Sequence, residues 1–225
     1  WGSVTDAEIV SKTVRGMDVV FHLAARVNVD ESIDDPWSVI DVNVRGTYNV
    51  LQAVRQQEAR LIHASTCEVY GAPYPGEERI NEQHEMRPYS PYAASKAGAD
   101  RLCFSYYKTF GTPVTIVRPF NIYGERQKDG KGGAVIAIFA KRALEGQSLL
   151  ITGNGQQTRD YMHVSDLVQA YNLVFEHPEL NGQSINFGSG TEVSIRDIAE
   201  HIAKATGVQT QYGSERPGEV DRFLS

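Results

Sequence analysis

The stretch "DVVFHLAA", residues 18–25, decides how the first half of the chain is interpreted. It is a continuous apolar run that ends in small residues, which is typical of a strand buried on both faces of a sheet. A helical stretch follows at about 36–57, opened by "DDP", since proline is favoured in a first helical turn. Two further runs, "RLIHAS" (60–65) and "PVTIVRPF" (113–120), repeat the strand pattern. Apolar strands separated by helices predict right-handed crossovers and a parallel, doubly wound α/β sheet.

The helix between the last two strands has clear end signals. Its sequence is "SPYAASKAGADRLCFSYYKTF", residues 90–110. Ser90 is the expected N-cap, Pro91 the first helical residue and Gly111 the stop. These signals predict that the polar residues of "YAASK" lie in the first two turns of this helix.

The pattern changes after Phe120. Helices are expected at about 134–145, 161–177 and 194–207, with strands at 148–152 and 184–189. We predict two interleaved lobes, one formed by 1–120 with 161–187 and a smaller α/β lobe formed by 121–160 with 188–225. A cleft between two such lobes is a usual place for a ligand.

Composition excludes several classes of function. The chain has 225 residues, 41% hydrophobic and 22% charged, with a formal net charge of −6, which is ordinary for a globular protein. An acidic chain without a basic stripe is not expected to bind nucleic acid. No apolar run approaches the ~20 residues of a membrane span. Two cysteines are too few for a disulfide framework, so a cytoplasmic location is expected, and the histidines show no metal-ligand spacing.

Tyr92 and Lys96 are the first candidates for chemistry. They are four residues apart in the predicted helix and therefore share a face. An ammonium beside a phenol favours the phenolate and lowers the tyrosine pKa from ~10. Such a tyrosine can accept the proton of a substrate hydroxyl. The spacing alone is equally typical of a solvated pair, so the context of the pair decides its interpretation.

Six motifs in one order supply that context. They are "HLAA" (22–25), "NVRGT" (43–47), "STCEVYG" (65–71), "YAASK" (92–96), "RPFNIYG" (118–124) and "TRDYMHVSD" (158–166). Together they resemble the extended short-chain dehydrogenases/reductases, and more narrowly the NAD-dependent epimerase/dehydratase family that acts on nucleotide sugars. The resemblance implies a partial NAD-binding Rossmann domain over 1–120 and 161–187, a nucleotide-sugar lobe over 121–160 and 188–225, and a homodimer that pairs through the helices of Asn43 and Tyr92.

The same resemblance implies roles for individual residues. Thr66, Tyr92 and Lys96 would be catalytic, with Lys96 also holding the nicotinamide ribose. The set implied to bind NAD comprises Leu23, Ala24, Ala25, Asn43, Ser65, Tyr92, Lys96 and Pro119. The set implied to hold the UDP- or dTDP-hexose substrate comprises Asn121, Arg159, Arg216 and Glu219. An arginine suits this role because its planar fork grips a phosphate in two places.

Cys67 and Glu68 bear on which reaction the family resemblance implies. Epimerases of this family need only the threonine, tyrosine and lysine, whereas dehydratases need one residue to remove the C5 proton and another to protonate the departing C6 hydroxyl. Glu68 fits the base, and the Cys67 thiol, protonated at neutral pH, can act as the proton donor. We therefore expect a 4,6-dehydratase or 5,6-dehydratase. The alternatives are a UDP-hexose 4-epimerase and, from another class, a non-catalytic dinucleotide-binding relative. A glutamate here also occurs in UDP-glucuronate decarboxylases.

Two features of the resembled family have no counterpart in the sequence. The glycine-rich phosphate turn and the acidic residue that reads the adenosine ribose would precede Trp1, and further helices would follow Leu224. We therefore expect an internal piece of a longer protein, truncated at both ends, that by itself binds NAD weakly and is inactive. The choice between NAD and NADP is left open at this point.

Overall fold

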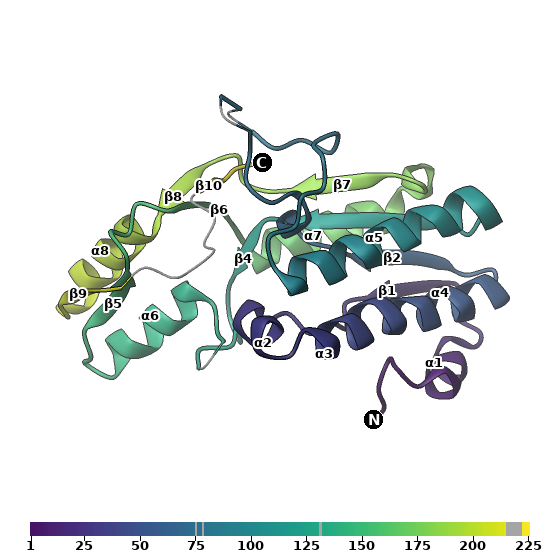
Figure 1. Ribbon diagram of the computed structural model, residues 1–225, viewed down its shortest axis with the longest axis horizontal. Coiled ribbons are helices and arrows are strands. Elements are labelled where there is room, and N and C mark those ends of the chain that lie inside the picture. The colour runs from purple at the N-terminus through teal and green to yellow at the C-terminus, as the bar shows by residue number, and fades with distance from the viewer. Residues whose placement is uncertain (75, 78, 131, 215–221) are drawn as a thin grey trace. The chain divides into compact units, whose positions relative to one another are not determined.

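The computed structural model describes residues 1–74, 76–77, 79–130, 132–214 and 222–225. The chain forms two compact units (Figure 1). The first comprises 1–71, 82–119 and 168–187, and the second comprises 72–81, 120–167 and 188–225. Residues 72–81 and 161–167, which we expected in the first lobe, thus belong to the second unit.

A four-stranded parallel sheet forms the centre of the first unit. Its strands are β1 (Val19–His22), β2 (Arg60–Ala64), β3 (Val114–Pro119) and β7 (Ser184–Phe187), in the order β1-β2-β3-β7. The predicted parallel α/β architecture is confirmed. Because all four strands run the same way, their carboxyl ends meet at one edge, which is where open α/β sheets bind ligands.

Helices cover both faces of this sheet, as alternate strand residues show. Leu61 and Ile116 pack into one apolar cluster with the helices α4 (Gly46–Gln56) and α5 (Pro91–Phe110). Ile62 and Val117, the next residue along each strand, pack on the other side with α7 (Val164–Glu176). Strand side chains alternate between faces, so the two clusters lie on opposite sides of the sheet.

The first strand differs from its prediction. It covers only residues 19–22, and Phe21 is 42% exposed, so β1 is not buried on both faces. The reason is its position in the described sheet, where β2 is its only neighbour and β1 is an edge strand. Phe21 contacts the rings of Tyr171 and Phe175 on α7.

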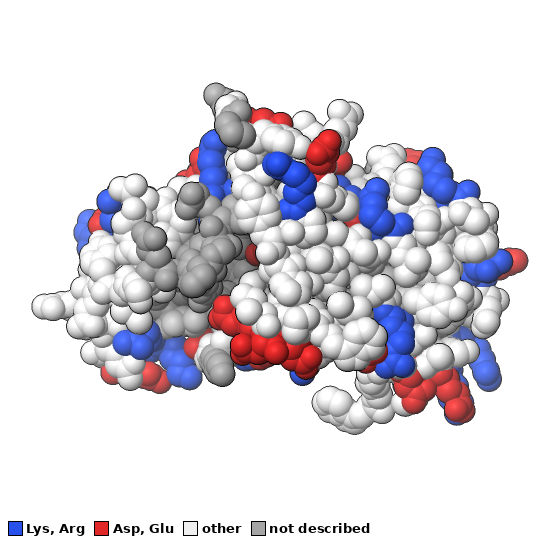
Figure 2. Space-filling view, in the orientation of Figure 1, with Lys and Arg blue, Asp and Glu red and all other residues white. Residues whose placement is uncertain are grey.

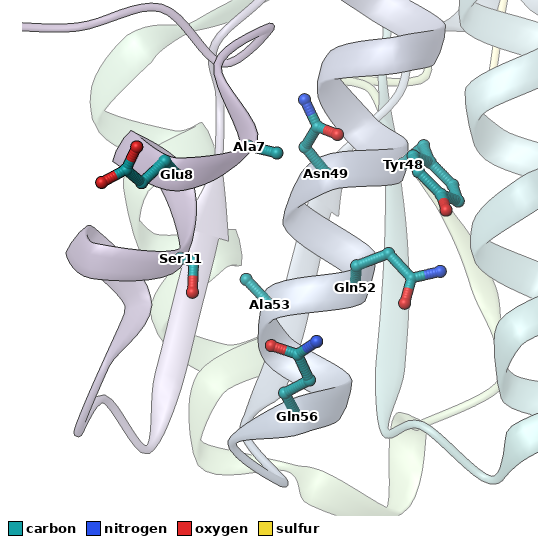
Figure 3. A pocket seen from close by; sticks show the side chains of 8 residues that line it. All are labelled: Ala7, Glu8, Ser11, Tyr48, Asn49, Gln52, Ala53 and Gln56. Carbon is teal, nitrogen blue, oxygen red and sulfur yellow. The ribbon is translucent and has the colours of Figure 1, made fainter.

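Four shorter helices precede α4 in the chain. They are α1 (Ala7–Val14), α2 (Val29–Asp34), α3 (Pro36–Ile40) and a π-helical turn, η1 (Asp41–Arg45). The single helix expected at 36–57 is therefore α3, η1 and α4 in succession. Helix α1 packs against α4 beside a hollow of about 460 Å³, whose lining includes Glu8 and Ser11 of α1 and Gln52 and Gln56 of α4 (Figure 3). The Asn49 side chain on α4 donates a hydrogen bond to the carbonyl of Val4, which precedes α1, at 2.9 Å.

The second unit is built on two small sheets. One has the order β10-β6-β4, with β8 antiparallel to β6, and the other pairs β5 with β9. A cluster of apolar side chains, including Phe139, Leu149 and Ile195, joins the second sheet to its helices. The elements of this unit are β4 (Asn121–Tyr123), α6 (Val135–Leu144), β5 (Leu149–Thr152), β6 (Thr158–His163), β8 (Glu192–Ser194), α8 (Ile195–Thr206), β9 (Thr210–Gly213) and β10 (Arg222–Phe223). The first unit also contains, among its described residues, the 3-10 turns η2 (Cys67–Tyr70) and η3 (Pro178–Leu180).

Acidic side chains gather on the surface over α2, whose sequence carries Asp30, Glu31 and Asp34 (Figure 2). Within the described residues, no helix has the length and apolar character that crossing a bilayer requires. No group of three potential metal ligands is found in the same residues.

Candidate active site

The segment 65–71 connects β2 to a tight turn. Thr66 is the N-cap of η2, and its side chain accepts from the Glu68 backbone N–H at 3.3 Å. Gly71 ends the turn with a φ of +68°. A Cβ at this position would collide with the Arg87 carbonyl oxygen, so only glycine fits without strain. The strand and the turn together place Thr66, Cys67 and Glu68 at the carboxyl end of β2.

Tyr92 and Lys96 lie in the first two turns of α5, where the helix signals predicted them. The Ser90 side chain accepts from the Ala93 N–H at 3.1 Å, Pro91 begins the helix and Gly111 ends it in the left-handed conformation. Both functional side chains are buried, with 8% and 4% of their surface exposed.

The Tyr92 hydroxyl lies within hydrogen-bonding reach of the Thr66 side chain. Burial raises the pKa of Tyr92, the negative charge of Glu68 raises it further, and the hydrogen bond from Thr66 opposes both effects only in part. The direction is the reverse of the one expected from the neighbouring lysine. The physical reason is that desolvation and the negative charge of Glu68 both disfavour the phenolate.

Lys96 is directed to the end of β2. Its ammonium donates to the Ala64 carbonyl oxygen at 2.5 Å. Burial lowers the Lys96 pKa to about 8, although Cys103 and Asp100 act in the opposite direction. The ammonium of Lys96 thus lies at the carboxyl edge of the sheet. It loses its proton at a lower pH than a solvated lysine does.

Asn43 links the segment after β1 to the helix of Tyr92. It lies in η1, where the wider helical turn carries an extra residue. Its Oδ1 accepts from the Arg26 N–H at 2.8 Å, and its Nδ2 donates to the Arg26 carbonyl at 2.9 Å and to Ser95 Oγ at 2.8 Å. Ser95 Oγ donates in turn to the Tyr92 carbonyl at 2.7 Å. These bonds fix α5 against the segment that follows β1.

The other residues implied to bind NAD lie at the same edge of the sheet. Leu23 and Ala24 follow β1 and are exposed, and Ala25 is half-buried. Pro119 is the last residue of β3 and is half-buried. Ser65 is buried, and its hydroxyl donates to the Asp100 carboxylate at 2.7 Å.

The residues implied to bind substrate fall in the second unit or outside the described chain. Asn121 begins β4, and among the described residues its Oδ1 is buried without a hydrogen-bond partner. Arg159 lies in β6 and donates to the Thr158 carbonyl at 2.8 Å. Arg216 and Glu219 lie outside the described residues.

Three buried polar side chains near the site were not among the predicted residues. His22 and His63 are paired across β1 and β2 with ring centroids 5.3 Å apart. Lys96 and burial lower the pKa of both imidazoles, that of His22 to about 4. Asp100 lies one turn after Lys96 on the same face of α5, so the four-residue spacing that selected Tyr92 and Lys96 would also have selected Asp100.

A parallel sheet that brings Thr66, Tyr92 and Lys96 to its carboxyl edge defines an α/β protein of the short-chain dehydrogenase/reductase class. The chain belongs to the NAD dependent epimerase/dehydratase family, whose sequence model matches residues 1–188. The family resemblance found in the sequence is thereby confirmed.

Curated relatives of this chain have several activities. It is 40% identical over 208 residues to a UDP-N-acetyl-alpha-D-glucosaminuronate decarboxylase from Bacillus cytotoxicus, covering 91% of this chain and 64% of that protein. It is 34% identical over 226 residues to a dTDP-glucose 4,6-dehydratase from Streptomyces niveus, covering 99% of this chain and 66% of that protein. The chain therefore spans about two thirds of the length of these relatives.

Solved structures match the fold closely. Pal from Bacillus thuringiensis superposes with a TM-score of 0.95 at 35% identity, over 100% of this chain and 72% of that one. The dTDP-glucose 4,6-dehydratase DesIV from Streptomyces venezuelae, determined with NAD bound, gives a TM-score of 0.92 at 31% identity, over 99% of this chain and 69% of that one.

Proposed function

We propose that this chain takes part in NAD-dependent modification of a nucleotide sugar by transient oxidation at C4, and that the reaction is a dehydration of the 4,6- or 5,6-type. The observation that carries the proposal is the grouping of Thr66, Glu68 and Tyr92, with the Tyr92 hydroxyl in reach of Thr66 and under the electrostatic influence of Glu68. An epimerase has no need of a carboxylate at that place.

The residues present fit an NAD cofactor. Lys96 holds a buried positive charge at the carboxyl edge of the sheet, where its ammonium can also reach a ribose hydroxyl. Ala24 and Ala25 leave room above the end of β1, and Pro119 borders the same edge at the end of β3. When bound, NAD would supply the hydride chemistry that these side chains lack: it would take a hydride from C4 and, in the 4,6-type reaction, return it to C6.

The side chains would move the protons. Tyr92 accepts the proton of the C4 hydroxyl, and Thr66 orients that hydroxyl. Glu68 removes the C5 proton once C4 is a ketone, while Cys67 protonates the C6 oxygen, which leaves as water as the C5–C6 double bond forms. Glu68 then returns its proton to C5. The proton taken by Tyr92 balances the proton given by Cys67, so the net change is the loss of one water.

The test is to incubate the full-length protein and NAD with UDP- and dTDP-hexoses and with the corresponding uronic acids, and to follow the mass of the nucleotide sugar. A loss of water supports the dehydratase. An unchanged mass with inverted C4 would replace it by the epimerase, and a loss of carbon dioxide by a decarboxylase, the activity of the 40% identical relative. Equal turnover by Tyr92→Phe and the parent would contradict all three.

We further propose that the protein is a cytoplasmic homodimer. An apolar hollow of about 330 Å³ supports the dimer, since it is formed by η1 and its neighbouring helices together with α5. Its lining comprises Trp37, Ile40, Asp41, Val44, Arg45, Tyr48 and Leu102. An exposed apolar patch of this kind is typical of a surface that another protein covers.

A further inference from the structure

A buried ion pair lies behind the active-site segment 65–70. Asp100, on α5, and Arg118, on β3, are 0% and 2% exposed. Arg118 Nε donates to Asp100 Oδ2 at 2.8 Å and Arg118 Nη2 donates to Oδ1 at 3.0 Å. This two-point geometry fixes the orientation of both side chains.

Each member of the pair holds one end of the segment. Ser65 Oγ, at its start, donates to Asp100 Oδ2 at 2.7 Å. Arg118 Nη1 donates to the Tyr70 hydroxyl, at its end, at 2.7 Å. The Tyr70 hydroxyl in turn donates a hydrogen bond to Asn186 Oδ1 on β7 at 2.7 Å. The residues between these ends are the proposed catalytic residues Thr66, Cys67 and Glu68, followed by Val69.

The pair also belongs to the helix that carries the other half of the site. Asp100 is four residues after Lys96 and eight after Tyr92, so all three lie on one face of α5. Through Ser65 and Tyr70 the pair thus ties both ends of the segment to α5 and β3, in addition to the Lys96 bond to the Ala64 carbonyl. A buried ion pair contributes little net stability compared with apolar side chains of the same volume, so stability alone is a weak reason for its presence here.

We propose that Asp100 and Arg118 are positioning residues, which act through Ser65 and Tyr70 to hold Thr66 and Glu68 in register with Tyr92. The catalytic consequence rests on the proposed function, whereas the ordering of the segment does not. Near-attack geometry is sensitive to small displacements, and a misplacement of about 1 Å can cost about 100-fold in rate.

The test uses variants that spare both charges, because removal of one partner leaves the other buried and unpaired. Ser65→Ala and Tyr70→Phe each cut one link between the pair and the segment. Ser184→Ala is the matched control, since Ser184 Oγ also accepts from Arg118 Nη2, at 3.1 Å, but lies on β7 outside the segment.

Hydrogen exchange of the backbone amides of 65–71 is measured first, on this chain without cofactor. We expect Ser65→Ala and Tyr70→Phe to raise the exchange rates about tenfold and Ser184→Ala to leave them at the parent values. Unchanged exchange in the first two variants, or equal acceleration in all three, would overturn the positioning role.

Steady-state kinetics of the full-length protein then test the catalytic consequence. We expect kcat to fall by about 10- to 100-fold in Ser65→Ala and Tyr70→Phe, with the KM for NAD and for the nucleotide sugar nearly unchanged, and Ser184→Ala to retain the parent kcat. A loosened segment with unchanged kcat would overturn the proposal. If the parent turns over no nucleotide sugar, the proposed function fails, and the exchange result still decides whether the ion pair orders the segment.

Discussion

The negative charge of Glu68 opposes the ionisation of Tyr92. The carboxylate and the burial of the ring both keep the phenol protonated, and the Thr66 hydrogen bond relieves this only in part. A phenol in this state is a poor base until positive charge is placed nearby. An oxidised nicotinamide, which is cationic, would supply such a charge. The site is thus suited to ionise Tyr92 when the cofactor is bound.

Glu68→Gln separates the candidate reactions at the level of one residue. If Glu68 removes the C5 proton, the substitution lowers the rate of water loss by about 100- to 10,000-fold. Glu176→Gln, at the end of α7, is the control and leaves the rate unchanged. The measurement is the mass of the nucleotide sugar over time in the full-length protein. An epimerase would show near-parent turnover in Glu68→Gln, which would contradict the role assigned here.

Lys96 makes the stability of the chain depend on pH. Its pKa is about 8 in the folded chain and ~10.4 when unfolded. Between these values the unfolded state binds more protons, so this residue makes stability rise with pH. From pH 7 to 9 the parent gains about 1 kcal/mol relative to Lys96→Met, because one pKa unit corresponds to ~1.4 kcal/mol.

Urea unfolding of both proteins at the two pH values checks this expectation. Tyr92 and Cys103, whose pKa values burial raises, act in the opposite direction at high pH, but both proteins carry them and their contributions largely cancel in the difference. A free-energy difference between parent and variant that is the same at pH 7 and pH 9 would contradict the lowered pKa of Lys96.

At the scale of elements, the turn after β2 depends on one glycine. Gly71 and Gly111 both have a φ of +68°, but a Cβ meets the Arg87 carbonyl only at Gly71, and at Gly111 it meets nothing within 4 Å. Their ψ angles differ, at −156° for Gly71 and 13° for Gly111. Gly111→Ala therefore carries the left-handed backbone cost of about 1–2 kcal/mol, whereas Gly71 lies in a region that essentially only glycine adopts. We expect Gly71→Ala to lose at least 1 kcal/mol more, because a backbone oxygen must move.

Thermal and urea unfolding of the two variants give this difference directly. Gly111→Ala is the control, since it shares the positive φ but has the ordinary left-handed ψ and open space around the added Cβ. Equal destabilisation by the two substitutions would show that the Arg87 carbonyl yields freely and that the turn is not fixed by this contact.

Elements with local end signals could be predicted from the sequence. The helix from Pro91 to Phe110 has a capping serine, a first-turn proline and a terminal glycine, and it begins and ends where they indicate. The segment "TRDYMH" carries no such signal. It forms β6 through pairing with β4 and β8, and the predicted helix at 161 begins only at Val164. Pairing between distant segments is not encoded in local periodicity.

The same distinction explains how much of the candidate site could be predicted from the sequence. Tyr92, Lys96 and Thr66 are found by motif and spacing, and the parallel sheet brings them to one edge. The rise in the Tyr92 pKa depends on burial, which only the packed unit defines. In the sequence, Arg118 stands near the end of an apolar strand and no local pattern indicates its role. Its hydrogen bonds to Asp100 and Tyr70 form only when α5 packs on the sheet.

At the scale of the whole molecule, the apolar hollow on α3, η1, α4 and α5 is the surface we assign to a second copy of this chain. Ile40 and Tyr48 are 40% and 45% exposed there. The hot spots of an interface cluster near its centre, and truncating one costs about 2 kcal/mol or more. We therefore expect Ile40→Asp to weaken the dimer of the full-length protein by at least about 30-fold, since an unpaired charge would replace an apolar contact.

Sedimentation equilibrium of the full-length protein measures this effect. Leu173→Asp is the control because Leu173 is also exposed, at 55%, but lies on α7, which packs on the other face of the sheet. The pairing surface contains η1, so it also adjoins Asn43, which holds the catalytic helix through Ser95. Loss of the dimer in Ile40→Asp should therefore lower activity as well, by loosening η1. A monomeric parent, or equal weakening by Leu173→Asp, would contradict the assignment of this surface.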